Sequence, residues 1–223
     1  MACVLVDEQE LEKIKSSKYI SSGDEGICYL YRGLIFKLYR ELMHDRKIDF
    51  DYEVSQNIAF PNDILISIDN KKILGYTMNL LNGINLKNGF VEDLELNDLK
   101  NAYKNIRREI ERFSYIDMNN ISLTNILYDY INKEFNIIDT SLWTLKGNSN
   151  NKNIERFNYI LIRCLSITLD WNRYILNSKQ ILFDLYGMHL NGESYFIEFL
   201  TELEMIVSEL KNEKVKKIKD LII

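Results

Sequence analysis

The chain has very little proline, cysteine and histidine, and it lacks a long apolar run. Its 223 residues include one proline, three cysteines and two histidines. Three cysteines without metal-type spacing indicate neither a disulfide framework nor a zinc site. No apolar run approaches the roughly 20 residues of a membrane-spanning helix, and no basic segment followed by an apolar one opens the sequence. We therefore expect a cytoplasmic protein without a membrane span.

An excess of positive charge is also absent, because the formal net charge is −5. Proteins that bind nucleic acids are normally basic, so we expect no nucleic-acid partner. The composition, 46% hydrophobic and 27% charged, is that of an ordinary globular protein. The length is sufficient for one large domain or for two small lobes that each have a core.

The N-terminal third is rich in aromatic and β-branched residues bounded by glycines, which is typical of strands and hairpins. We expect strands within 19–39 and a second hairpin within 64–78. Between them, residues 41–59 have a charged, helix-permissive pattern that ends before Pro61. This part of the chain is therefore predicted to be an antiparallel sheet with one helix.

Farther along the chain the pattern becomes helical. Apolar residues recur at steps of three and four between 96 and 113, which predicts an amphipathic helix. Three further helical patterns follow, at about 152–174, 178–187 and 192–221. The predicted fold class is thus α+β, with a strand-rich part at 1–82 and a mostly helical part at 83–223.

Two polar residues, Asn125 and Asp139, each close a short β-type run in the predicted helical part. A nucleotide-bound Mg²⁺ takes few protein oxygens and fills its other positions with phosphates and water. An amide and a carboxylate at the ends of neighbouring strands suit this need. We therefore predict Asn125 and Asp139 as metal ligands.

Residues that suit a phosphate site precede this pair. Gly23 and Gly26 bound a short turn, and glycines in such a turn let backbone N–H groups approach phosphate oxygens. Lys37 stands between apolar residues of a strand-like run and offers a cation. In this order along the chain, the glycines, the lysine and the two metal ligands form a candidate nucleotide site.

These residues resemble the protein-kinase-like superfamily over about 19–145. The segment from Ser21 to Cys28 is similar to the Gly-rich loop G-x-G-x-x-G-x-V, with Ser21 in place of the first glycine, and Ile35-Phe36-Lys37 is similar to the end of V-A-I-K. The resemblance implies a bilobal fold that binds ATP and Mg²⁺ in the cleft between the lobes. Lys37 would contact the α- and β-phosphates.

The resemblance also implies roles for residues around Lys37. Glu53 corresponds to the glutamate that holds this lysine, and Cys28 ends the Gly-rich segment. Met78 would lie at the back of the adenine pocket, and the backbone from Asn79 to Leu81 would bond the base edge. An unidentified protein or small molecule would be the phosphate acceptor.

The catalytic segment departs from the family pattern H-R-D-x-x-x-x-N. Asn120 occupies the aspartate position, five residues before Asn125, and an amide accepts no proton from a hydroxyl. The nearest acid is Asp117, which would have to take over that role. No A-P-E motif follows Asp139. Three functions therefore stay open: a divergent phosphotransferase, a pseudokinase that binds ATP without transferring phosphate, and a small-molecule kinase similar to the aminoglycoside and choline phosphotransferases.

Overall fold

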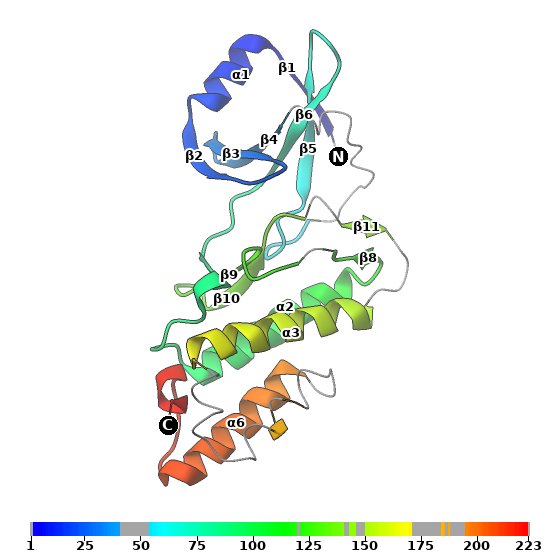
Figure 1. The fold of residues 1–223 in the computed structure, drawn as a ribbon. Helices are drawn as coiled ribbons and strands as arrows, with labels where there is room; N and C mark the ends of the chain where they lie inside the picture. The colour runs from blue at the N-terminus through cyan, green and yellow to red at the C-terminus, as the bar shows by residue number, and fades with distance from the viewer. Residues whose placement is uncertain are drawn as a thin grey trace. The chain divides into compact units, whose positions relative to one another are not determined.

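The computed structural model describes residues 2–40, 54–119, 121–140, 143–145, 150–170, 184–185, 187 and 195–222. The chain divides into two compact units (Figure 1), which are Met1–Leu81 with Ile138–Leu142 and Asn82–Ile137 with Trp143–Ile223. We call them the sheet unit and the helical unit. The sequence placed the boundary at residue 82, whereas the sheet unit ends at Leu81 and also includes Ile138–Leu142.

The sheet unit is built on one mixed six-stranded sheet with the order β1-β5-β6-β4-β3-β2. Its strands are β1 (Ala2–Val6), β2 (Lys18–Ser22), β3 (Gly26–Tyr31), β4 (Leu34–Tyr39), β5 (Pro61–Ser67) and β6 (Ile73–Asn79). The hairpins predicted within 19–39 and 64–78 are confirmed. The prediction of a purely antiparallel sheet is wrong, because β1, which was not predicted, pairs in parallel with β5.

One face of this sheet is covered by helix α1 (Glu8–Lys15), which lies against β3 (Figure 1). Asp7 caps the helix by accepting a hydrogen bond of 2.7 Å from the Glu10 N–H. Ile14 is fully buried and packs with Val6, Leu38 and Leu65. A capped, amphipathic helix of this kind closes the apolar face of the sheet.

This helix is not the one that the sequence predicted. Residues 54–59, the end of the predicted helix over 41–59, are not helical in the structure, and 41–53 lie outside the described residues. The described end of that segment instead contains a turn in which the Ser55 hydroxyl accepts from the Ile58 N–H at 3.0 Å.

The helical unit contains three of the four α-helices that the described residues form. They are α2 (Leu96–Arg112), α3 (Asn150–Thr168) and α6 (Phe196–Lys211), accompanied by the 3-10 turns η2 (Leu86–Asn88) and η3 (Ile218–Leu221). The predicted helix within 96–113 is confirmed. The helix expected over 192–221 is shorter, because Asn212 adopts a left-handed conformation that ends α6. Most of 178–187 lies outside the described residues.

Two small sheets complete the helical unit. Strands β9 (Ile126–Asp129) and β10 (Glu134–Ile137) form an antiparallel hairpin that β7 (Ile84–Asn85) extends, and β8 (Ile116–Asp117) pairs with β11 (Thr144–Leu145). None of the helices among the described residues combines the length and apolar character that a membrane crossing requires. The observed fold class is α+β, as predicted.

The helices of this unit are joined by one buried amide. The carbonyl oxygen of Asn158 in α3 accepts from the Tyr103 hydroxyl of α2 at 2.7 Å and from the Phe196 N–H of α6 at 3.2 Å. Burial raises the pKa of Tyr103 to about 12, so its hydroxyl stays protonated and donates at neutral pH. This contact fixes α3 against both neighbours.

Candidate functional site

Lys37 lies in β4 with its side chain on the face of the sheet opposite α1. Because side chains alternate along a strand, Lys37 shares this face with Ile35 and Tyr39, whereas Leu38 points to the α1 side. Only 5% of Lys37 is exposed. Its ammonium lies 5.7 Å from the centroid of the Tyr76 ring. The lysine therefore places a cation on an otherwise apolar surface.

The ammonium of Lys37 is bonded to two carboxylates. It donates to Glu25 at 2.7 Å and to Asp139, which stands 102 residues farther along the chain. Asp139 has a φ of +60°, a left-handed conformation that aspartate tolerates better than most residues. The neighbouring Thr140 hydroxyl donates to the Ala59 carbonyl at 2.9 Å. The structure thus brings Lys37 and Asp139 together within the sheet unit.

The neighbours of Lys37 favour its charged form. Burial by itself lowers the pKa of this lysine, but the Tyr76 phenol and the charge and hydrogen bonds of Asp139 and Glu25 raise it by more. The net pKa lies above the usual lysine range, so the group is an ammonium throughout neutral pH. Its stabilising contribution is complete below the unfolded pKa of about 10.4, and it is lost only as the pH rises through the folded value.

The structure requires a glycine at only one of the two glycine positions in the predicted phosphate loop. Both belong to the turn between β2 and β3, where the Gly23 N–H donates to the Gly26 carbonyl at 3.0 Å. A Cβ on Gly26 would lie 2.3 Å from the Leu38 carbonyl oxygen, whereas a Cβ on Gly23 would meet nothing within 4 Å. Packing of β3 against β4 therefore requires Gly26. Gly23 is the open position of the turn.

Most residues that the sequence predicted as contacts of the base lie on the face of the sheet that carries Lys37. Cys28 stands opposite Lys37 in the β3–β4 register, and burial raises the pKa of its thiol. Met78 in β6 is 7% exposed and packs with this cluster, as does Leu81. Asn79 ends β6, and its side-chain oxygen accepts a hydrogen bond of 3.0 Å from the Asn62 amide. Cys28, Met78 and Leu81 thus pack in the apolar cluster on the face of the sheet that carries Lys37, and their contact with a base stays a prediction.

Asn125 belongs to the helical unit. The sequence placed it at the end of a strand, whereas in the structure it precedes β9. Its side-chain oxygen accepts from the Ser122 hydroxyl and from the Thr124 hydroxyl, the latter at 3.2 Å, and its N–H donates to the Ser122 carbonyl at 3.0 Å. A tight turn therefore orients this amide. That Asn125 and Asp139 share one cation stays a prediction.

Asp117, the predicted substitute base, is 1% exposed in β8. Its carboxylate accepts from the guanidinium of Arg156 and lies 3.7 Å from the ammonium of Lys152, both on α3. The adjoining backbone is fixed by Asn153, whose amide accepts from the Met118 N–H at 3.0 Å and donates to a neighbouring carbonyl. These are the contacts of a structural ion pair, and a catalytic role for Asp117 stays a prediction.

Two predicted site residues, Glu53 and Asn120, lie outside the described residues. Sequence reasoning missed Glu25 as a partner of Lys37, although it stands between the two glycines of the predicted loop. No local signal pointed to this pairing, because a charged residue in a turn is usually exposed to solvent. No protein-family model matches the chain, and no curated protein matches it significantly. The function is therefore argued from the geometry of the chain itself.

Proposed function

We propose that the chain is a protein-kinase-like protein of bilobal type that binds ATP with Mg²⁺, and that the sheet unit supplies the contacts to the base and phosphates. The contact between Lys37 and Asp139 carries this proposal. A buried ammonium offers a cation for the α- and β-phosphates. The carboxylate beside it, whose side chain is 45% exposed, offers an oxygen to a divalent cation.

The composition of the site supports a cation that arrives with the nucleotide. The described residues contain no group of three or more histidines, cysteines or acids that could hold a metal ion. Mg²⁺ accepts one or two protein oxygens and completes its shell with phosphates and water. In this proposal the sheet unit supplies Asp139 as a protein ligand of that cation.

The apolar surface around Lys37 supports an aromatic base as the other end of the ligand. Cys28, Met78 and Leu81 lie on this face of the sheet. Ligand sites combine mostly apolar walls with a few placed polar groups. Lys37 and Asp139 are such groups, and in this proposal the backbone from Asn79 to Leu81 bonds the edge of the base.

Thermal unfolding with ATP, in the presence and absence of Mg²⁺, tests this proposal. At a hundred times Kd a ligand adds about 2.7 kcal/mol, which raises the Tm of a chain of this size by about 5–10 °C. We expect this shift only with Mg²⁺, and we expect Asp139→Asn to remove it. Asp98→Asn, which alters another aspartate paired with a lysine, is the matched control and should keep the shift. A wild-type chain without an Mg²⁺-dependent shift contradicts the proposal.

A pseudokinase is the second candidate for the same nucleotide site. The contacts of Asp117 with Arg156 and Lys152 favour it. Asp117 is the acidic residue nearest upstream of Asn120 in the sequence, and its carboxylate is already engaged in these ion pairs. General-base catalysis contributes about 10²–10⁴-fold, so its loss slows phosphoryl transfer but leaves nucleotide binding intact. Transfer of labelled γ-phosphate by the wild-type chain supports the divergent phosphotransferase, acting on a protein or small-molecule hydroxyl, and its absence supports the pseudokinase.

A further inference from the structure

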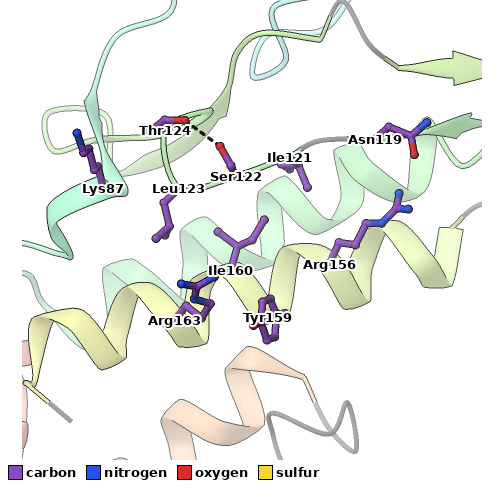
Figure 2. A pocket seen from close by; sticks show the side chains of 10 residues that line it. All are labelled: Lys87, Asn119, Ile121, Ser122, Leu123, Thr124, Arg156, Tyr159, Ile160 and Arg163. Atoms are coloured by element: carbon purple, nitrogen blue, oxygen red, sulfur yellow. Dashed lines mark hydrogen bonds between the residues drawn. The ribbon is translucent and has the colours of Figure 1, made fainter. Parts of the chain in front are cut away.

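A pocket of about 560 Å³ lies within the helical unit, between the segment that leads into β9 and one side of α3. Figure 2 shows Arg156 and Ile160 rising from α3 toward the segment that carries Ile121 and Leu123. Lys87 of η2 lies at the end of the pocket opposite Arg156. This volume is typical of a small-molecule site.

The charge lining this pocket has one sign. Lys87, Arg156 and Arg163 are among the residues that line it, and the described lining includes no aspartate or glutamate. Asp117 offsets part of the charge, since it accepts a hydrogen bond from Nη1 of Arg156. A guanidinium carries five N–H donors, so one bond to Asp117 uses only part of what Arg156 offers. The pocket therefore favours an anion.

The walls between these cations are apolar. Ile160 is 7% exposed, and Ile121 and Leu123 are half-buried where they line the pocket. The guanidinium of Arg163 lies 5.8 Å from the centroid of the Tyr159 ring, which also lines the pocket. An inorganic ion would leave these surfaces in contact with water. A ligand with an apolar part covers them and gains from their burial.

We propose that this pocket binds a small organic molecule that carries a phosphate group. Arg163 and Lys87 contact the phosphate, Ile121, Leu123 and Ile160 contact the organic part, and Arg156 at the opposite end adds positive charge to the pocket. A phosphate monoester carries a charge of about −1.5 to −2 at pH 7, which several cations match better than a carboxylate would. Arginine also binds phosphate through two parallel hydrogen bonds.

The residues of this pocket differ from the Lys37–Asp139 pair that carries the proposed function. Every residue that lines the pocket belongs to the helical unit, whereas Lys37 and Asp139 belong to the sheet unit. The two proposals therefore rest on different residues, and their tests use different ligands. A chain that binds no nucleotide can still bind a phosphate ester at this pocket.

Titration of the full-length chain with phenyl phosphate at low ionic strength, followed by calorimetry, tests the proposal. We expect saturable binding, and we expect Arg163→Gln and Lys87→Gln each to weaken it about tenfold, because hydrogen bonds to charged groups contribute about that factor. Both side chains are exposed, so these variants should fold. Arg108→Gln, at an exposed arginine of α2 outside the pocket lining, is the matched control and should leave the affinity unchanged.

Two further ligands show which part of phenyl phosphate is bound, and the variant Lys37→Met shows whether binding occurs at this pocket. Inorganic phosphate and benzoate should each bind about tenfold more weakly than phenyl phosphate, since each lacks one half of the proposed contacts. Equal affinity for inorganic phosphate overturns the assignment to an organic ligand. Loss of phenyl phosphate binding in Lys37→Met, or an equal loss in Arg108→Gln and Arg163→Gln, overturns the assignment to this pocket, as does the absence of saturable binding.

Discussion

Replacement of Gly75 by alanine is expected to destabilise the sheet unit by about 3–5 kcal/mol, which is a large part of the 5–15 kcal/mol that stabilises a typical domain. Gly75 lies in β6, between Leu38 of β4 and Leu65 of β5. A Cβ at this position would lie 1.9 Å from the Lys37 carbonyl oxygen. Because β6 is paired with β4 on one side and with β5 on the other, it cannot move away from β4 without breaking backbone hydrogen bonds.

The backbone conformation adds to this effect. Gly75 has a φ of +151°, which side-chain-bearing residues rarely adopt, and such strain costs about 1–3 kcal/mol. Urea unfolding monitored by circular dichroism measures the total. Gly33→Ala is the matched control, because Gly33 has a φ of +81° but a Cβ there would meet nothing within 4 Å. It should cost only about 1 kcal/mol. Equal losses in the two variants would contradict the clash with β4.

The second large effect is expected at Lys37. Lys37→Met keeps the length and apolar stem of the side chain but removes the cation, and loss of a buried charge partner costs about 2–5 kcal/mol. At about 1.4 kcal/mol per tenfold, we expect Mg²⁺-ATP to bind roughly 30- to 4,000-fold more weakly. Equilibrium titration with labelled ATP measures this change.

Two further variants separate phosphate binding from loss of an ion pair. Glu25→Gln removes a carboxylate that bonds Lys37 and opposes incoming phosphates, so it should tighten ATP binding although it also breaks a pair. Lys100→Met removes the pair with Glu204 in the helical unit, and it should leave the affinity unchanged. If Glu25→Gln and Lys37→Met weaken binding equally, the lysine supports the fold rather than the phosphates.

Elements made by local contacts were predicted well. Helix α2 follows from the spacing of its apolar residues, and the β5–β6 hairpin follows from two β-rich runs around a polar turn. The parallel pairing of β1 with β5 joins residues about 60 positions apart, and no local pattern encodes such a contact. Helix α1 did have a local signal, because Asp7 and Glu10 form an N-terminal cap, but eight residues are too few for a clear period.

The sequence predicted which residues belong to the candidate site better than it predicted the contacts between them. The order of Gly23, Lys37 and Asp139 suggested the site, but only the tertiary structure places Lys37 beside Asp139. The partner Glu25 was missed, because a charge-bearing turn residue is usually solvated. Asn125 was placed at a strand end, whereas hydrogen bonds from Ser122 and Thr124 hold it in a turn, the local bonding that these residue types favour.

Photolabelling with 8-azido-ATP in the presence of Mg²⁺, followed by peptide mapping, tests most directly whether the sheet unit binds the nucleotide. The azide reports the position of the base, so the proposal predicts labelling of the peptides that contain Cys28 or the segment from Met78 to Leu81. Excess ATP should prevent this labelling. Labelling that ATP does not prevent, or ATP-sensitive labelling found in the helical unit alone, would contradict the account.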